Sequence, residues 1–122
     1  MFNINSNNNI ITINRGDTVD YTFTINLGTK RFEDKYTLTT GDSLYFGLME
    51  PNQPFECALL RLEFTEADND EDGNVKIHLD SSMTENLLSG RYYYSIKLRQ
   101  AVLDGEDKVT TLIPNTKFAI YE

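Results

Sequence analysis

The stretch TVDYTFTINL, residues 18–27, alternates polar and apolar side chains without an exception. Successive side chains of a β-strand point to opposite faces of a sheet, so this period of two predicts a strand with one buried and one solvent-facing side. The apolar side consists of Val19, Tyr21, Phe23, Ile25 and Leu27. We therefore expect residues 18–27 to contribute one strand to a layered β-core.

The same alternation recurs along the chain and predicts most of the other strands. The residues expected to face inward are Leu60, Leu62, Phe64, Val75, Ile77, Leu79, Tyr92, Tyr94, Ile96 and Leu98. Those expected to face outward are Arg61, Glu63, Lys76, His78, Arg91, Ser95, Lys97 and Arg99. Residues 10–13 predict an opening strand, and residues 109–113 and 117–121 predict a closing strand bent at Pro114. Residues 44–49 are apolar on both faces, which predicts a strand that is central or covered by another segment.

Turn-forming residues separate these runs and set the expected architecture. They are Arg15-Gly16-Asp17, Gly28, Gly41-Asp42, Pro51, Pro54, Asp72-Gly73-Asn74 and Asp104-Gly105, of which the last two predict hairpins. One short helix is predicted where Ser82 and Glu85 have the spacing of a capping box, with Gly90 ending the turn. About seven strands with close turns predict an all-β fold, an immunoglobulin-like antiparallel β-sandwich, with a small barrel as the alternative.

The chain is expected to form one domain. It has 122 residues and a mass of 14.0 kDa, which is enough for a single core. We expect this domain over residues 10–122 and an Asn-rich arm over residues 1–9, in which Phe2 and Ile4 alternate and could add an edge strand. The start, MFNINSNNN, has neither a basic leader nor an apolar segment, so no secretory signal is expected.

The charge balance disfavours two classes of partner. Eleven Lys and Arg face nineteen Asp and Glu, which gives a net charge of −8. Nucleic acids are bound largely through cationic side chains, so no nucleic-acid partner is expected. Anionic membranes are disfavoured for the same reason, and no apolar run is long enough to span a bilayer. The single cysteine excludes an internal disulfide and a multi-cysteine zinc site.

Few residues in the sequence suggest catalysis. His78 is the single histidine, with Asp80 on the same predicted outer face, and no Ser or Cys stands beside it in sequence to act as a nucleophile. We expect a surface histidine without a catalytic role, and a buried or half-buried structural thiol at Cys57. Arg15-Gly16-Asp17 spells an adhesion tripeptide, but we interpret it as a tight turn. No catalytic or cofactor-binding residue is predicted, so the chain is not expected to be an enzyme.

An acidic segment resembles the start of a calcium loop. Asp68, Asp70 and Asp72, followed by Gly73, match its first, third, fifth and sixth positions. The twelfth position would be Leu79 where a bidentate Glu is needed, and the flanks are predicted strands rather than helices. We therefore favour an acidic hairpin loop and assign no metal ligand, while a weak divalent-ion site stays open as the alternative.

Several tyrosines are candidates for contacts or for bracing the fold. Tyr92 and Tyr94 are expected in the core, and one tyrosine of this run is a candidate for the tyrosine corner of immunoglobulin-like sandwiches. Tyr45, Met49 and Tyr93 are predicted on the outer face, where they would form an interaction patch if they clustered.

The order of these motifs resembles that of small immunoglobulin-like phage domains related to the N-terminal domain of baseplate upper proteins. The matching residues are 11–13, 15–18, 72–74, 79, 88–94, 104–105, 111–113 and 118, so the resemblance spans about residues 10–120. It implies a non-catalytic component of a phage virion. In baseplate proteins the domain heads a longer chain, whereas here it fills the sequence, which favours a small accessory.

The resemblance thus leads us to expect a phage structural protein, made in the host cytoplasm and present in the virion. It would act as an accessory, decoration or adaptor on the capsid, fibre or tail and baseplate. Its partners would be other virion proteins, with the chain as a homo-oligomer or in many copies. The alternative is a carbohydrate-binding β-sandwich module, in which Tyr45 and Tyr93 would stack on sugars.

Overall fold

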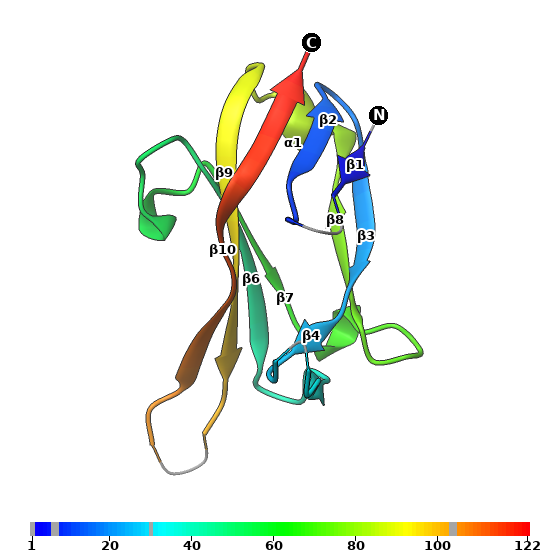
Figure 1. The fold of residues 1–122 in the computed structure, drawn as a ribbon, viewed down its shortest axis with the longest axis vertical. Helices are drawn as coiled ribbons and strands as arrows, with labels where there is room; N and C mark the ends of the chain where they lie inside the picture. The colour runs from blue at the N-terminus through cyan, green and yellow to red at the C-terminus, as the bar shows by residue number, and fades with distance from the viewer. Residues whose placement is uncertain (1, 6–7, 30, 103–104) are drawn as a thin grey trace.

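The computed structural model describes residues 2–5, 8–29, 31–102 and 105–122, and it is mostly β-structure (Figure 1). The strands are β1 (Asn3–Ile4), β2 (Ile11–Asn14), β3 (Val19–Phe23), β4 (Ile25–Asn26), β5 (Lys35–Tyr36), β6 (Ser43–Met49), β7 (Leu60–Phe64), β8 (Val75–Leu79), β9 (Gly90–Gln100) and β10 (Lys108–Tyr121). The helical segments are η1 (Phe55–Cys57), η2 (Glu66–Asp68) and α1 (Ser81–Glu85). The predicted all-β class with one short α-helix is therefore confirmed.

The strands form two unequal layers. One layer is a six-stranded sheet in the order β1-β2-β10-β9-β6-β7, and the other is the pair β3-β8. A further pair, β4-β5, extends the second layer at one end (Figure 1). The opposition of β3 and β8 to β6, β9 and β10 is the immunoglobulin-like arrangement of a β-sandwich. One pairing departs from the antiparallel expectation, because β2 lies parallel to β10. The turn at residues 15–17 sends the chain from β2 into the other layer, so β2 pairs with the last strand.

Residues 18–27 form two strands rather than the single strand that their alternation predicts. Val19 and Ile25 are buried and the polar residues between them are exposed, as predicted. The strand is divided at Thr24, because β3 pairs with β8 whereas β4 pairs with β5. At the other end of the chain, the two runs predicted on either side of Pro114 form one strand, β10, whose pairing with β9 shifts register on both sides of Ile113.

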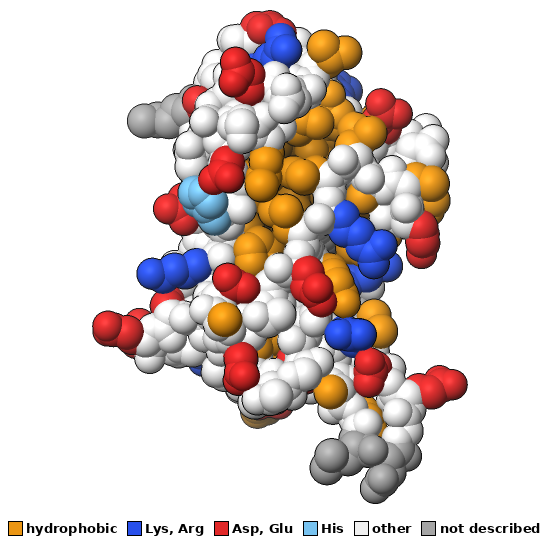
Figure 2. Space-filling model, turned by 180° about the vertical axis from the view of Figure 1, so that it is seen from behind, with side chains coloured by type: hydrophobic (Ala, Val, Ile, Leu, Met, Phe, Trp, Pro, Cys, Tyr) orange, Lys and Arg blue, Asp and Glu red, His pale blue; other side chains and the backbone are white. Residues whose placement is uncertain are grey.

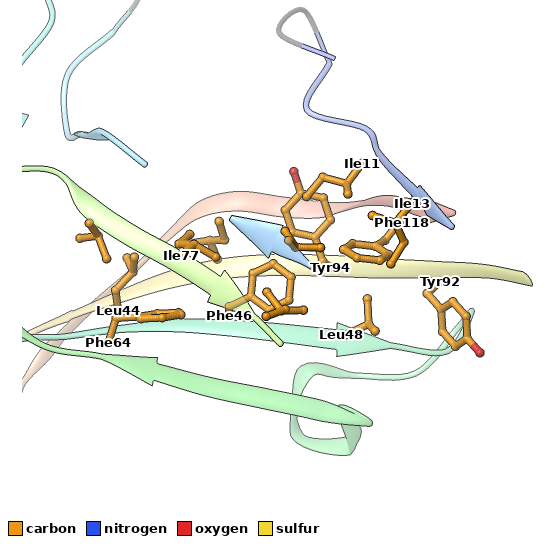
Figure 3. Packing of buried hydrophobic residues seen from close by; sticks show 14 of the residues in the cluster. Ile11, Ile13, Leu44, Phe46, Leu48, Phe64, Ile77, Tyr92, Tyr94 and Phe118 are labelled. Carbon is orange, nitrogen blue, oxygen red and sulfur yellow. The ribbon is translucent and has the colours of Figure 1, made fainter. Parts of the chain in front are cut away.

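Three aromatic rings occupy the centre of the core (Figure 3). The rings of Phe46 and Tyr94 stack with centroids 5.4 Å apart, and the Phe118 ring meets them edge-on at 6.4 Å and 6.1 Å. Offset and edge-to-face pairs of this kind add to the stabilisation from burial alone. The hydroxyl of Tyr94 donates to the carbonyl of Asn9, and burial raises the pKa of Tyr94 to about 12.

A loop covers the outer face of the large sheet at its centre. Phe55 of η1 lies over Gly47, where an added Cβ would approach the Phe55 ring to 2.4 Å. Gly47 pairs with Ser95, and Ser95 is only 2% exposed, with its hydroxyl donating to the carbonyl of Ile113 over 2.8 Å. Met49 on the same face is also buried. The predicted outward exposure of Ser95 and Met49 is therefore wrong, and β6 is a covered strand.

The connections correct three further predictions. Cys57 is exposed rather than buried, because η1 places only Phe55 against the sheet. The helix follows an N-cap at Asp80, so Ser82 lies inside it and forms no capping box. A capping box is instead formed by Thr65, the N-cap of η2, and Asp68. Gly90 does not end the helix, since it begins β9.

The two predicted hairpin turns have different outcomes. Residues 72–74 form a tight turn closed by an isolated bridge between Asn69 and Val75, but the flanking strands β7 and β8 belong to different layers, so they are not a hairpin. Asp104 of the second turn lies outside the described residues, although β9 and β10 pair antiparallel on both sides of it. The hydroxyl of Tyr92 donates to the carbonyl of Leu88 over 2.6 Å, which is the predicted tyrosine corner.

Asp42 joins the start of β6 to the end of β9. It is 3% exposed, and its carboxylate accepts hydrogen bonds from the Tyr36 hydroxyl, from the amide and hydroxyl of Thr39 and from the amide of Ala101. Burial raises the pKa of this carboxyl, but the hydrogen bonds outweigh burial and the net pKa is lowered from 3.8. The ionised form of Asp42 is therefore favoured by folding.

We expect Asp42→Asn to lower the free energy of unfolding at neutral pH by about 1.5–3 kcal/mol, the usual contribution of hydrogen bonds to a charged group. The folded-state pKa lies below the unfolded value of 3.8. The stabilisation is therefore complete above pH 3.8 and is lost as the pH falls through the folded-state pKa. Urea unfolding at several pH values should show the wild type and the variant converging in acid; a constant difference would contradict this.

We expect Phe118→Ala to cost about 3–5 kcal/mol of unfolding free energy, since it removes a fully buried ring from the aromatic group. Phe32→Ala is the matched control, because the Phe32 side chain is 72% exposed; its cost should be within about 0.5 kcal/mol. Similar losses for the two variants in denaturant unfolding would show that the core is assigned to the wrong face.

Candidate functional site

The two layers are closed on one side of the sandwich and open on the other. On the closed side β1 pairs with β2, and the Phe2 ring beside β1 lies 5.7 Å from the Tyr21 ring of β3. On the open side β7 ends one layer and β8 ends the other, and no strand of the described residues pairs with either of the two edges that remain. The core is therefore less completely covered between β7 and β8.

Figure 2 shows the result as a band of hydrophobic side chains that runs along the molecule beside the face carrying the histidine. The half-buried hydrophobic residues of β7 and of the α1 segment, which we call the apolar seam, are Leu60, Leu62, Met83 and Leu87. Leu59 and Leu88 extend the apolar surface of the same segments and are 51% and 71% exposed. Contiguous apolar surface of this kind is typical of protein interaction sites.

The edge of β7 adds unpaired backbone groups beside the seam. Because β7 is the last strand of its sheet in the described part of the chain, alternate N–H and C=O groups point away from β6. Natural edge strands are usually protected by proline, by an inward-pointing lysine or by a bulge. Residues 60–64, LRLEF, contain neither proline nor lysine.

Charged and aromatic groups lie on the outer face of β7, opposite the apolar seam. The Arg61 guanidinium lies 5.4 Å from the centroid of the Tyr45 ring and 5.1 Å from that of Phe55. Side-chain hydrogen bonds with Ser43 and then with Tyr45 lower the pKa of Glu63, helped by the positive charge of nearby arginines. Both charges of β7 are therefore held on the face opposite the seam.

The outward tyrosines do not form the exposed patch that the sequence left open. Tyr45 is half-buried beneath the guanidinium groups of Arg61 and Arg99, the latter 6.0 Å from its ring centroid. Tyr93 is half-buried opposite the buried Met49. The Tyr45 ring is thus already stacked within the chain, which does not favour its use as a sugar platform.

His78 is brought between two carboxylates on the outer face of β3 and β8. Its Nε2 lies 2.6 Å from Asp80 Oδ1, and its Nδ1 lies 4.0 Å from Asp20 Oδ1. The side chains of all three residues are at least 49% exposed. Sequence reasoning found Asp80, but Asp20 is adjacent only through the pairing of β3 with β8. A solvated group of this kind has no enclosure for a substrate.

The acidic segment uses its carboxylates to shape turns. Asp68 Oδ2 accepts the amide of Thr65 over 2.9 Å, and Asp70 Oδ1 accepts the amides of Asp72 and Asn74, each over 2.9 Å. In the part of the chain that the structure describes, no three His, Cys, Asp or Glu side chains are grouped to hold a metal ion. The side chains of Asp68, Asp70 and Asp72 do not converge as calcium ligands do.

A separate pocket of about 540 Å³ lies on the outer face of β2, β10 and β9, near the end of the chain. Its lining includes Thr12 and Ala119, whose small side chains leave the hollow, and the cations Arg91 and Lys117. Neither cation has an ion-pair partner among the described residues.

Arg15, beside this region, donates to the carbonyl of Glu85 and pairs with Glu122, so the Arg15-Gly16-Asp17 tripeptide is a structural turn.

Comparison with models of known protein families, with curated proteins and with solved structures gives no significant match for this chain. In addition, no helix within the described ranges is both long and apolar enough to cross a membrane.

We expect His78→Gln to change the free energy of unfolding by less than about 1 kcal/mol, because its contacts with Asp20 and Asp80 are exposed to solvent and such surface contacts contribute little to stability. Thermal or urea unfolding measures this directly. A larger loss would mean that the group formed by Asp20, His78 and Asp80 braces the small sheet.

Proposed function

We propose that this protein is a non-enzymatic structural component of a phage virion, an accessory, decoration or adaptor protein that docks through protein–protein contacts. The observation that carries the proposal is the apolar seam beside the unpartnered edge of β7. A sheet edge of this kind binds another chain by adding a strand, with main-chain hydrogen bonds for affinity and side-chain pockets for specificity.

The resemblance to phage baseplate domains supplies the virion context, and the positions of its motifs support the proposal. The Arg15-Gly16-Asp17 motif is the turn between the two layers, and the run at residues 88–94 carries the tyrosine corner. These residues have structural roles, so what the resemblance implies is a scaffold that presents a surface rather than a catalytic centre.

Many weak contacts are sufficient for such a role. A virion presents neighbouring proteins in symmetric arrays, so multivalent attachment raises the overall affinity without a large single interface. The net charge of −8 favours solubility before assembly. The partners would be capsid, fibre or tail proteins, and the protein would be located in the virion after synthesis in the host cytoplasm.

The test is the protein content of purified virions. We expect the 14.0 kDa chain to be present at a stoichiometric copy number in particles purified by density gradient. Its absence from intact particles would overturn the proposal.

A matched pair of variants tests the seam. Leu62→Lys places a charge at the centre of the seam, whereas Thr22→Lys places the same charge on the exposed face of β3. We expect the first variant to be incorporated several-fold less than the wild type and the second to be incorporated normally, with thermal unfolding showing that both are folded. Equal incorporation would exclude the seam as the docking surface.

A further inference from the structure

We propose that the occupant of the β7 edge is the β7 edge of a second copy of this chain. The two strands pair antiparallel about a two-fold axis at Leu62, so that two six-stranded sheets become one continuous sheet. This inference rests on the proposed role of the seam as a contact surface: the second copy occupies the β7 edge, and the paired protein then attaches to other virion proteins with two equivalent copies.

The sequence of β7 is complementary to its own reverse. In an antiparallel pair centred on Leu62, residue 60 faces residue 64 of the second copy and residue 61 faces residue 63. The strand reads LRLEF from residue 60 to residue 64. Each apolar residue is therefore opposite an apolar residue, and each charge is opposite its counterion.

The charge pairs lie on the outer face of the joined sheet. Arg61 of each copy faces Glu63 of the other, so the two-fold axis generates the pair twice. Hydrogen bonds with Ser43 and Tyr45 lower the pKa of Glu63, which favours the charged form that this pairing needs. Opposite charges directly across two strands stabilise the pairing, and like charges in the same positions oppose it.

The apolar pairs close the seam on the inner face. Leu60 faces the second copy's residue 64, which is a phenylalanine, and the two copies of Leu62 meet at the axis. Leu60 and Leu62 are half-buried in the single chain, whereas Phe64 is already buried. Pairing removes the remaining apolar surface of the two leucines from water, which is the main driving force for association.

The edge of β8 on this side, where Val75 forms an isolated bridge with Asn69, lacks this complementarity. The strand β8 reads VKIHL from residue 75 to residue 79. Antiparallel pairing of β8 with itself would place Lys76 opposite His78, so no counterion pair would form. On the far side of the large sheet, β1 has only two residues. Of these three edges, the charge pattern therefore favours β7 as the self-pairing strand.

Charge reversal tests the register. Sedimentation equilibrium of the 122-residue chain should show that the wild type is a dimer. Arg61→Glu places Glu opposite Glu twice, and Glu63→Arg places Arg opposite Arg twice. We expect each single variant to weaken the dimer by about tenfold or more. The double variant R61E/E63R, and an equimolar mixture of the two single variants, should restore dimerisation.

The controls separate this interface from folding and from the proposed function. Circular dichroism and thermal unfolding must show folded single variants, since Arg61 also contacts Tyr45 and Phe55. Lys76→Glu, on the exposed face of β8, should leave the dimer unchanged. A monomeric wild type, or a dimer that neither reversal weakens, would overturn the pairing. A monomer that is nevertheless present in virions would overturn the pairing alone, whereas a dimer absent from virions would overturn the virion role alone.

Discussion

The structure depends on the burial of one face of a wide sheet by a narrow one. Alternate side chains of β6, β9 and β10 pack against those of β3 and β8, with Phe46, Tyr94 and Phe118 at the centre. Two strands cannot cover six, so the large sheet is shielded fully only where β3 and β8 cross it. The remaining apolar surface has to be covered by other means, and the two sides of the sandwich differ in how this is done.

On one side the N-terminal segment supplies the cover. The pairing of β1 with β2 brings Phe2 over Tyr21, and the carbonyl of Asn9 accepts the hydroxyl of Tyr94. Elsewhere side chains bond to backbone where the chain passes between layers: Thr84 donates to the carbonyl of Asp17 over 2.6 Å. Between β7 and β8 no strand of the described residues pairs with either edge, and Leu60 and Leu62 are only half-buried. The open seam is therefore a consequence of unequal layer widths rather than an isolated surface feature.

The sequence predicts what depends on local periodicity and misses what depends on distant segments. The period of two identified the buried residues Val75, Ile77 and Leu79 of β8, because alternation alone fixes which face of a strand is apolar. It failed at Ser95 and Met49, which lie on the outer face but are buried; Phe55, from a loop outside the strands, lies over Gly47, the β6 partner of Ser95. Cys57 was placed inside for the converse reason, since nothing local shows which residue of that loop meets the sheet. The parallel pairing of β2 with β10 joins the two ends of the chain and leaves no local pattern.

The sequence predicted only part of the apolar seam. Leu60 and Leu62 were recognised as inward-facing, but their partial exposure follows from the position of β7 at the end of its sheet, which only the topology reveals. Because β7 is an edge strand, its LRLEF sequence also determines how this edge can pair with another chain. An uncovered edge with apolar side chains is an aggregation hazard, because each added chain can present a new edge. Pairing about a two-fold axis avoids this hazard, since it uses the same edge of both copies and leaves only the short β1 strands at the ends of the joined sheet. Self-complementarity centred on Leu62 thus favours a closed dimer over the open-ended addition of further chains.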